Sequence, residues 1–217
     1  MSNDSPSLYL ITPPIADAPG FAPAFEAALD AGVVVCVLLR LDTRDEGLAK
    51  KIIRVLAPLA QERGAALLVE NDAQLAQRAG ADGAHIGIAG DDRDPALAEA
   101  IRKLKPDGIV GAGRLKSKDD AMTAGEQEVD YVMFGEPAAD GYTPAFEHTA
   151  ERVGWWAEIF NVPVVGYAAQ LDHVEALARA GAEFVALGAA VWDDARGPAA
   201  AVRDAMAAIA RSRAETA

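Results

Sequence analysis

The chain has 217 residues, 51% of them hydrophobic and 6% aromatic, and its formal net charge at pH 7 is −13. This length suffices for one sizeable core, and the acidic charge argues against nucleic acid or membrane partners, which require a cationic surface. The one cysteine, Cys36, cannot form an internal disulfide, and no apolar run reaches the length of a membrane span. Because the first residues also lack the pattern of a signal peptide, we expect a cytoplasmic protein.

Short apolar runs alternate with longer stretches of helical spacing along the whole chain. The strands are expected at residues 8–11, 33–39, 66–69, 83–86, 109–112, 131–134, 164–166 and 184–187. The helices are expected at residues 22–31, 45–63, 73–79, 95–104, 118–126, 147–160, 172–180 and 198–211. The strand candidates are apolar on both faces, as is typical of buried parallel strands. Eight strands, each followed by a helix, predict an α/β fold of the single (β/α)8 TIM barrel type.

This pattern leaves no room for a second domain. We therefore expect residues 1–217 to form one TIM-barrel domain, with the barrel over about residues 8–211 and short flexible termini. The Ala-rich stretch over residues 199–210 could pack on the barrel or on another subunit, so a homo-oligomer is left open.

Two segments far apart in the chain are nearly the same. Residues 78–87 read RAGADGAHIG, and residues 179–188 read RAGAEFVALG. In each, a glycine (Gly80 or Gly181) stands where a helix ends, a place where glycine adopts a left-handed conformation at little cost. The apolar run that follows enters a strand. A geometry shared by all helix-to-strand turns and an ancestral half-barrel duplication both explain the repeat, and both agree with a barrel.

Charged residues stand at the predicted C-terminal strand ends, where the chemistry of such barrels lies. They are Arg40 after the second strand, Glu70 and Asp72 after the third, and Asp91 and Asp92 after the fourth. Converging carboxylates are suitable ligands of Mg²⁺. However, the three aspartates also stand before helices, where they could cap the first turn, and Arg40 could pair with Glu70.

Three other residues have chemistry that a site could use. His85 alternates with buried positions, so we expect a hydrogen-bonded barrel histidine rather than a base. Trp192 follows the last strand and could form the wall of a heterocycle pocket. Cys36 lies inside the apolar run VVVCVLL, which predicts a small core residue rather than a nucleophile.

The motifs also follow an order known from one family. They are LYLIT, LLR after the second strand, END followed by QLAQRAGADGAHIG, then VGAG, VDYVMFG, VPVVGYA and AGAEFVALGAAV. This order resembles the thiamine phosphate synthase family, including its thiazole tautomerase-type relatives, over about residues 8–211. The resemblance implies a (β/α)8 barrel and a magnesium-dependent transferase of thiamine biosynthesis, a thiamine-phosphate diphosphorylase. Such an enzyme joins a pyrimidine methyl diphosphate to a thiazole phosphate and releases pyrophosphate, so a phosphorylated heterocycle is the expected partner.

The resemblance also implies a set of site residues, although it identifies no catalytic residue. Arg40 is expected to contact pyrophosphate, and Asp72 with Asp91 or Asp92 is expected to hold Mg²⁺. The full set of substrate-binding candidates is Arg40, Glu70, Asn71, Gly113, Gly135, Ala168, Ala169 and Gly188.

Several matched positions depart from the family pattern. Leu38 replaces a glutamine, Asp42 and Thr143 each replace a lysine, Ala168-Ala169 replaces a glycine pair, and Gly113 and Ala189 each replace a serine. Asp42 adds repulsion where the family supplies attraction, and a unit charge pair at about 4 Å and an effective dielectric of about 20 is worth roughly 4 kcal/mol. These losses leave an alternative open: a catalytically degenerate barrel that binds a heterocyclic ligand, or acts as a thiazole tautomerase-type or regulatory protein.

Overall fold

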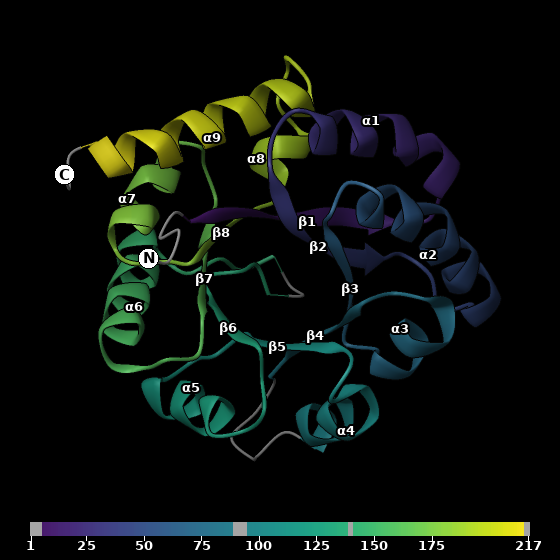
Figure 1. The fold of residues 1–217 in the computed structure, drawn as a ribbon, viewed down its shortest axis with the longest axis horizontal. Helices are drawn as coiled ribbons and strands as arrows, with labels where there is room; N and C mark the ends of the chain where they lie inside the picture. Colours follow the sequence, from purple (N-terminus) through teal and green to yellow (C-terminus); the bar gives the residue numbers. More distant parts are fainter. Residues whose placement is uncertain (1–5, 89–94, 139–140, 215–217) are drawn as a thin grey trace.

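Eight parallel strands close into a barrel in chain order, and β8 pairs back to β1 (Figure 1). The structure, a computed structural model, describes residues 6–88, 95–138 and 141–214. The strands are β1 (Ser7–Ile15), β2 (Val34–Leu41), β3 (Ala66–Glu70), β4 (Gly83–Gly87), β5 (Ile109–Gly113), β6 (Tyr131–Phe134), β7 (Val164–Ala168) and β8 (Phe184–Leu187). The predicted TIM barrel is confirmed.

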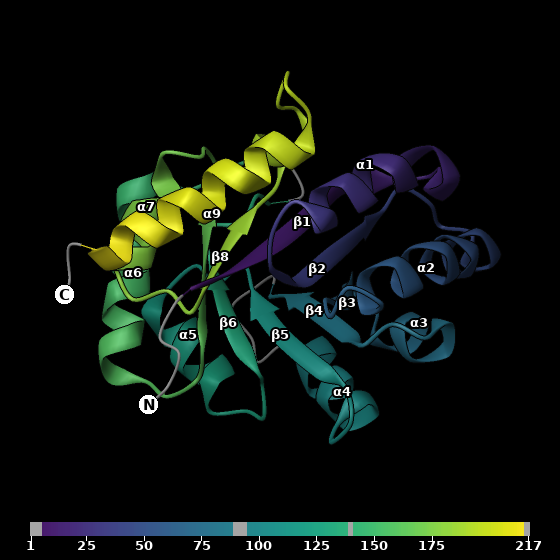
Figure 2. The same cartoon turned by 45° about the horizontal axis from the view of Figure 1, so that its top comes forward.

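Helices surround the barrel wall. They are α1 (Ala18–Asp30), α2 (Glu46–Gln61), α3 (Ala73–Ala79), α4 (Pro95–Leu104), α5 (Lys118–Gly125), α6 (Phe146–Ile159), α7 (His173–Arg179), α8 (Ala189–Trp192) and α9 (Pro198–Ala214). Figure 2 shows α9 lying across the outside of the barrel, where it contacts both α7 and α1. Within the described residues, no helix is long and apolar enough to cross a membrane.

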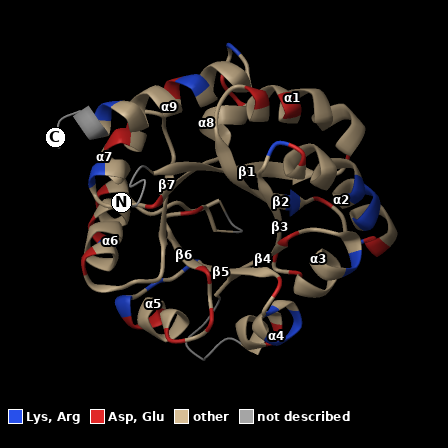
Figure 3. Cartoon of the chain, in the orientation of Figure 1, with Lys and Arg blue, Asp and Glu red and all other residues tan. Residues whose placement is uncertain are grey.

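The alternation of side chains along the strands divides the apolar residues into two cores. On β1, Leu8 and Leu10 face the large core between strands and helices. Tyr9 and Ile11 face a smaller core, which fills the barrel interior together with Cys36 and residues of four other strands. Cys36 is buried, and burial raises the pKa of its thiol, so the prediction of a core residue is confirmed. Charged side chains lie mostly on the outer helices and loops (Figure 3).

The repeated helix-to-strand junction has a shared hydrogen-bond geometry. Gly80 and Gly181 have φ values of 86° and 97°, the left-handed conformation expected for them. The acidic residue before β4, β6 and β8 accepts a hydrogen bond from the backbone N–H of the preceding strand. These bonds join Asp82 to Leu67 N–H at 2.7 Å, Asp130 to Val110 N–H at 2.7 Å, and Glu183 to Val164 N–H at 2.8 Å. The same hydrogen bond from a backbone N–H to an acidic side chain therefore forms before each of these three strands, and this shared geometry accounts for the repeat.

Two features near β1 differ from the sequence prediction. Strand β1 continues to Ile15, past two prolines, because a register shift between Ile11 and Pro14 interrupts its pairing with β2. Trp192, which the sequence suggests as a wall of a heterocycle pocket, makes structural contacts. Its indole N–H donates to the carbonyl of Ile11 at 2.7 Å, and its ring lies 4.9 Å from that of Phe21. Trp192 therefore fastens the short helix α8 to β1 and α1.

Candidate active site

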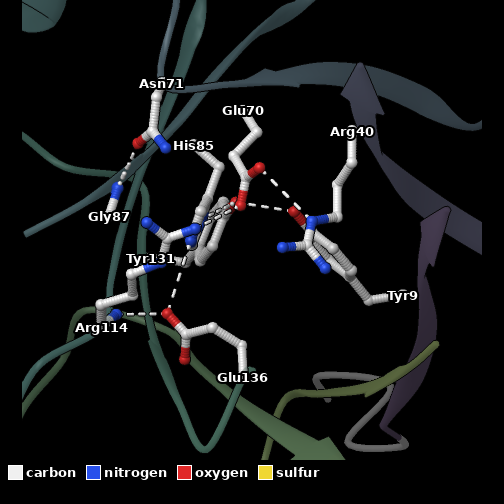
Figure 4. Close-up of polar contacts among 9 residues, drawn as sticks. All are labelled: Tyr9, Arg40, Glu70, Asn71, His85, Gly87, Arg114, Tyr131 and Glu136. Atoms are coloured by element: carbon white, nitrogen blue, oxygen red, sulfur yellow. Dashed lines mark hydrogen bonds and ion pairs between the residues drawn. The ribbon is translucent and has the colours of Figure 1, made fainter. Parts of the chain in front are cut away.

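Arg40, Glu70 and Arg114 form a linear ion-pair triad at the C-terminal ends of β2, β3 and β5 (Figure 4). Glu70 Oε2 accepts a hydrogen bond from Arg40 Nε at 3.3 Å, and Glu70 Oε1 accepts one from an Arg114 terminal nitrogen at 2.7 Å. The three side chains are only 19–21% exposed. The expected pairing of Arg40 with Glu70 is confirmed, and a second arginine joins it.

The irregular pairing of β1 also positions Arg40. The backbone N–H of Arg40 donates to the hydroxyl of Thr12 at 3.0 Å, at the point where β1 shifts its register against β2. Tyr167 on β7 lies within the electrostatic influence of Arg40: burial raises the pKa of the tyrosine, and the guanidinium charge opposes this. Asp42, two residues beyond Arg40, is exposed. Its carboxylate makes no contact with the triad among the residues that the structure describes.

Sequence reasoning missed Arg114, which Glu70 binds through the side chain and Glu136 through the backbone. Its φ is 56°, a conformation uncommon for a residue with a side chain, and its backbone N–H donates to the carboxylate of Glu136. Gly87 provides room for the side chain, since a Cβ at Gly87 would lie 2.8 Å from Arg114 Cδ. The signal in the sequence was a cation directly after a glycine-rich strand, which by itself does not distinguish a site residue.

A buried polar network continues from Glu136 into the barrel interior (Figure 4). His85 Nδ1 lies 2.9 Å from the hydroxyl of Tyr131, which lies 2.8 Å from the hydroxyl of Tyr9. Burial raises the pKa of both tyrosines well above the usual value. His85 Nε2 lies 3.7 Å from Glu136 Oε1 and has no hydrogen-bond partner among the described residues. His85 is thus the hydrogen-bonded barrel histidine that the sequence predicts.

Gly113 stands where the family pattern has a serine, and the structure leaves no room there for a side chain. A Cβ at Gly113 would lie 2.0 Å from Glu136 Oε1 and 2.4 Å from His85 Nε2. The carboxylate of Glu136 therefore fills the space that a serine would need. Gly113 remains a predicted substrate-binding residue only through its backbone.

A cavity of about 620 Å³ opens beside the triad, between the loops that follow β5 and β6. Its lining includes Gly135, a predicted substrate-binding residue, together with Arg114, Lys116, Glu136 and Arg152. The volume is in the usual range for small-molecule sites. Three of these lining side chains are cationic in a chain whose net charge is −13, so the cavity suits an anionic ligand.

Asp72, a predicted metal ligand, and Asn71, a predicted substrate-binding residue, both accept backbone hydrogen bonds in the structure. Asp72 caps α3, since its Oδ1 accepts from the backbone N–H of Leu75 at 2.8 Å. The amide oxygen of Asn71 accepts from Gly87 N–H at 2.8 Å. Asp91 and Asp92 lie outside the described residues. Within the described part of the chain, no group of three or more histidine, cysteine or acidic side chains could hold a metal ion. The predicted set of Asp72 with Asp91 or Asp92 therefore stays a prediction.

The remaining candidates lie on the same rim of the barrel but apart from the triad. Ala168 ends β7 and is buried, and Ala169 follows it on the surface. Gly188 follows β8, and a Cβ there would lie 3.1 Å from the hydroxyl of Tyr167. Because parallel strands end at one edge, these positions and Arg40 share one face of the barrel.

Known proteins resemble this chain over most of its length. A family profile described as thiamine monophosphate synthase matches residues 8–191. The thiamine-phosphate synthase of Rhodospirillum centenum is 42% identical over 91% of this chain and 94% of that protein. The enzyme of the same name from Hyphomonas neptunium is 37% identical over 90% of each chain.

A solved structure agrees with the fold. Thiamine phosphate pyrophosphorylase from Pyrococcus furiosus superposes with a TM-score of 0.76 over 96% of this chain and 98% of that chain, at 20% identity. At this identity the likeness bears on the fold alone, and the sequence matches carry the assignment. On those matches, the chain belongs to the thiamine monophosphate synthase family.

Proposed function

We propose that this protein joins a pyrimidine methyl diphosphate to a thiazole phosphate, forming thiamine phosphate and releasing pyrophosphate. The observation that carries the proposal is the full-length similarity to proteins named thiamine-phosphate synthase, at up to 42% identity. The alternative of a catalytically degenerate barrel is not favoured by these relatives. We also propose that the protein acts in the cytoplasm and that its partners are phosphorylated heterocycles.

The chemistry requires a site for a leaving diphosphate. The bond between the pyrimidine methylene carbon and the diphosphate oxygen breaks, the thiazole nitrogen bonds to that carbon, and the electron pair leaves with pyrophosphate. Negative charge therefore grows on the leaving group, where preorganised cationic donors lower the barrier. Arg40, held at the barrel rim by Glu70 and Thr12, is the donor we assign to this group.

The metal remains a prediction from the family. Because Asp72 caps α3 and Asp91 and Asp92 lie outside the described residues, no step of the proposed reaction is assigned to Mg²⁺ here. The expected ligands are still Asp72 with Asp91 or Asp92. A homo-oligomer likewise remains a prediction.

The test is release of pyrophosphate from the two family substrates in the presence of Mg²⁺. Arg40→Ala should raise the KM for the pyrimidine diphosphate by about 10- to 150-fold, since a charge-assisted hydrogen bond worth roughly 1.5–3 kcal/mol is lost. Its effect on the KM for the thiazole phosphate should be small. Absence of pyrophosphate at high enzyme concentration would end the proposal, and a wild-type KM in Arg40→Ala would remove Arg40 from the site.

A matched control is available at the other end of the barrel. Arg63 follows α2, is 24% exposed, and bridges two carboxylates, those of Asp30 and Glu26. It therefore resembles Arg40 in charge, exposure and pairing but lies away from the rim. Arg63→Ala should leave both KM values unchanged.

A further inference from the structure

Arg114 places a second guanidinium on the carboxylate that Arg40 binds. We propose that Arg114 and Arg40 together form a two-guanidinium site for the diphosphate, and that Glu70 is its internal counter-ion, which the diphosphate displaces. This inference rests on the proposed function, because it takes the diphosphate from that reaction. It assigns to Arg114 and Glu70 roles in anion specificity.

The first argument is the geometry of the triad. One carboxylate reaches both guanidiniums, with Oε1 on Arg114 at 2.7 Å and Oε2 on Arg40 at 3.3 Å. A single multi-oxygen anion in that place can therefore meet both. A phosphoryl group offers several oxygens and more charge than a carboxylate, and guanidinium forks match it well.

The second argument is how firmly the chain places Arg114. Glu136 binds its backbone N–H, and Gly87 lies beneath its side chain. The loop beyond it is held as well, since Arg152 donates to the carbonyls of Leu115 and Lys116 at 2.8 and 2.5 Å. Such preorganisation is typical of a binding residue and is not needed for a solvated surface arginine.

The third argument is access and charge. Arg114 is one of the residues that line the cavity of about 620 Å³, and its side chain is 19% exposed. Arg40 and Arg114 carry two positive charges and Glu70 carries one negative charge, so the triad has a net charge of 2 − 1 = +1. A diphosphate that enters next to Glu70 meets a like charge, and the two anions compete for the same donors. Removal of the Glu70 charge should therefore strengthen anion binding.

The test measures binding rather than turnover. Pyrophosphate, and separately inorganic phosphate, are titrated calorimetrically into the full chain without metal. Arg114→Gln should weaken pyrophosphate binding at least tenfold, and Glu70→Gln should tighten it several-fold. Arg63→Gln, which removes the same charge at the opposite end of the barrel, should change nothing. Circular dichroism melts of each variant confirm that it is folded.

The sign of the Glu70→Gln effect decides between two roles. If Glu70 only orients the arginines, Glu70→Gln weakens pyrophosphate binding, and that result overturns the proposed role of Glu70 as a displaceable counter-ion. Unchanged pyrophosphate binding in Arg114→Gln, or no binding by the wild-type chain at millimolar pyrophosphate, overturns the two-guanidinium site. Equal affinity for phosphate and pyrophosphate also overturns it, because a single phosphate group then accounts for the binding.

A second measurement covers the case in which Arg114→Gln or Glu70→Gln does not fold, and it uses only conservative lysine variants for assignment. The arginine Nε–H signals of Arg40 and Arg114 are assigned in NMR spectra by their loss in Arg40→Lys and Arg114→Lys. Both signals should shift as pyrophosphate is added, and a shift of Arg40 alone overturns the proposal. If pyrophosphate binds in this way but no thiamine phosphate forms, the proposed function fails while this inference stands.

Discussion

Replacement of Gly113 by alanine tests the structural reason for the missing family serine. The new Cβ would lie 2.0 Å from Glu136 Oε1, 2.4 Å from His85 Nε2 and 2.7 Å from His85 Cε1. Both side chains are buried, with exposed fractions of 8% and 2%. The imidazole cannot move freely, because its Nδ1 lies in a hydrogen bond with Tyr131. A single methyl group therefore disturbs two separate elements, β4 and the loop after β6.

The expected cost follows from three contributions. Overpacking of a dense core costs about 1–3 kcal/mol. If Glu136 withdraws, the backbone N–H of Arg114 loses its acceptor, which costs about 1–3 kcal/mol more. Replacement of glycine by alanine stabilises the folded state by about 0.4–1 kcal/mol, because it reduces the conformational entropy of the unfolded chain. The sum centres on about 3 kcal/mol, which lowers the Tm of a domain of this size by about 6–12 °C.

Thermal and urea unfolding of four variants measures this cost: Gly113→Ala, Glu136→Ala, the double variant and a control. Gly154→Ala on α6 is the control, because its Cβ would meet only Ala180 O, at an ordinary 3.6 Å, and a helical alanine is favoured. Glu136→Ala combined with Gly113→Ala should be less destabilising than the sum of the single changes by at least about 1 kcal/mol. A Gly113→Ala variant as stable as wild type, or an additive double variant, would show that Glu136 does not occupy the serine's space.

Three further predictions concern residues whose roles the structure defines. Asp72→Ala should lower the free energy of unfolding by about 0.5–2 kcal/mol because the helix cap is lost, whereas Asp72→Asn keeps an acceptor and should stay close to wild type. If Asp72→Asn keeps its Tm but no longer binds Mg²⁺ in calorimetry, Asp72 is also a metal ligand. Burial raises the pKa of the Cys36 thiol, so at pH 8 a thiol reagent should label the native protein far more slowly than the denatured protein, and equal rates would contradict the buried position. Burial also raises the pKa of Tyr9 and Tyr131 above the usual 10.0, so their contribution to stability is fully present below about pH 10 and is lost as the pH rises above it. The Tm of wild type should therefore fall more steeply above that pH than the Tm of Tyr131→Phe, and parallel curves would refute the assignment.

The barrel could be predicted from the sequence because its signals are local. Each apolar run, helix end and glycine junction is read within about ten residues, and chain order then supplies the topology. Two elements near the rim could not be predicted in this way. Strand β1 crosses Pro13 and Pro14: the register shift leaves Thr12 and Pro13 without a partner position on β2, and pairing resumes at Pro14 opposite Arg40. Helix α8 has four residues, too few to show a helical period.

The site could be predicted only in part because its contacts are long-range. Arg40 and Glu70 end neighbouring strands, so their pairing follows from the order of the strands alone. The contact of Arg114 with Glu70 spans 44 positions, and that of Arg114 with Glu136 spans 22. Such pairs exist only once the barrel is closed. Read by itself, Arg114 was one cation among several in a loop.

The departures from the family pattern take a different meaning once these contacts are considered. Motif by motif, the loss of two lysines and a serine indicates degeneration. In the structure, Asp42 is exposed and makes no contact with the triad among the described residues, Glu136 fills the place of the serine, and Arg114 places a cation on the same rim. These features are coupled through space, because Glu136 accepts from the backbone N–H of Arg114 and a Cβ at Gly113 would meet Glu136. In the proposed two-guanidinium site, Arg114 would supply positive charge that the replaced lysines no longer supply, and unchanged pyrophosphate binding in Arg114→Gln would refute this interpretation.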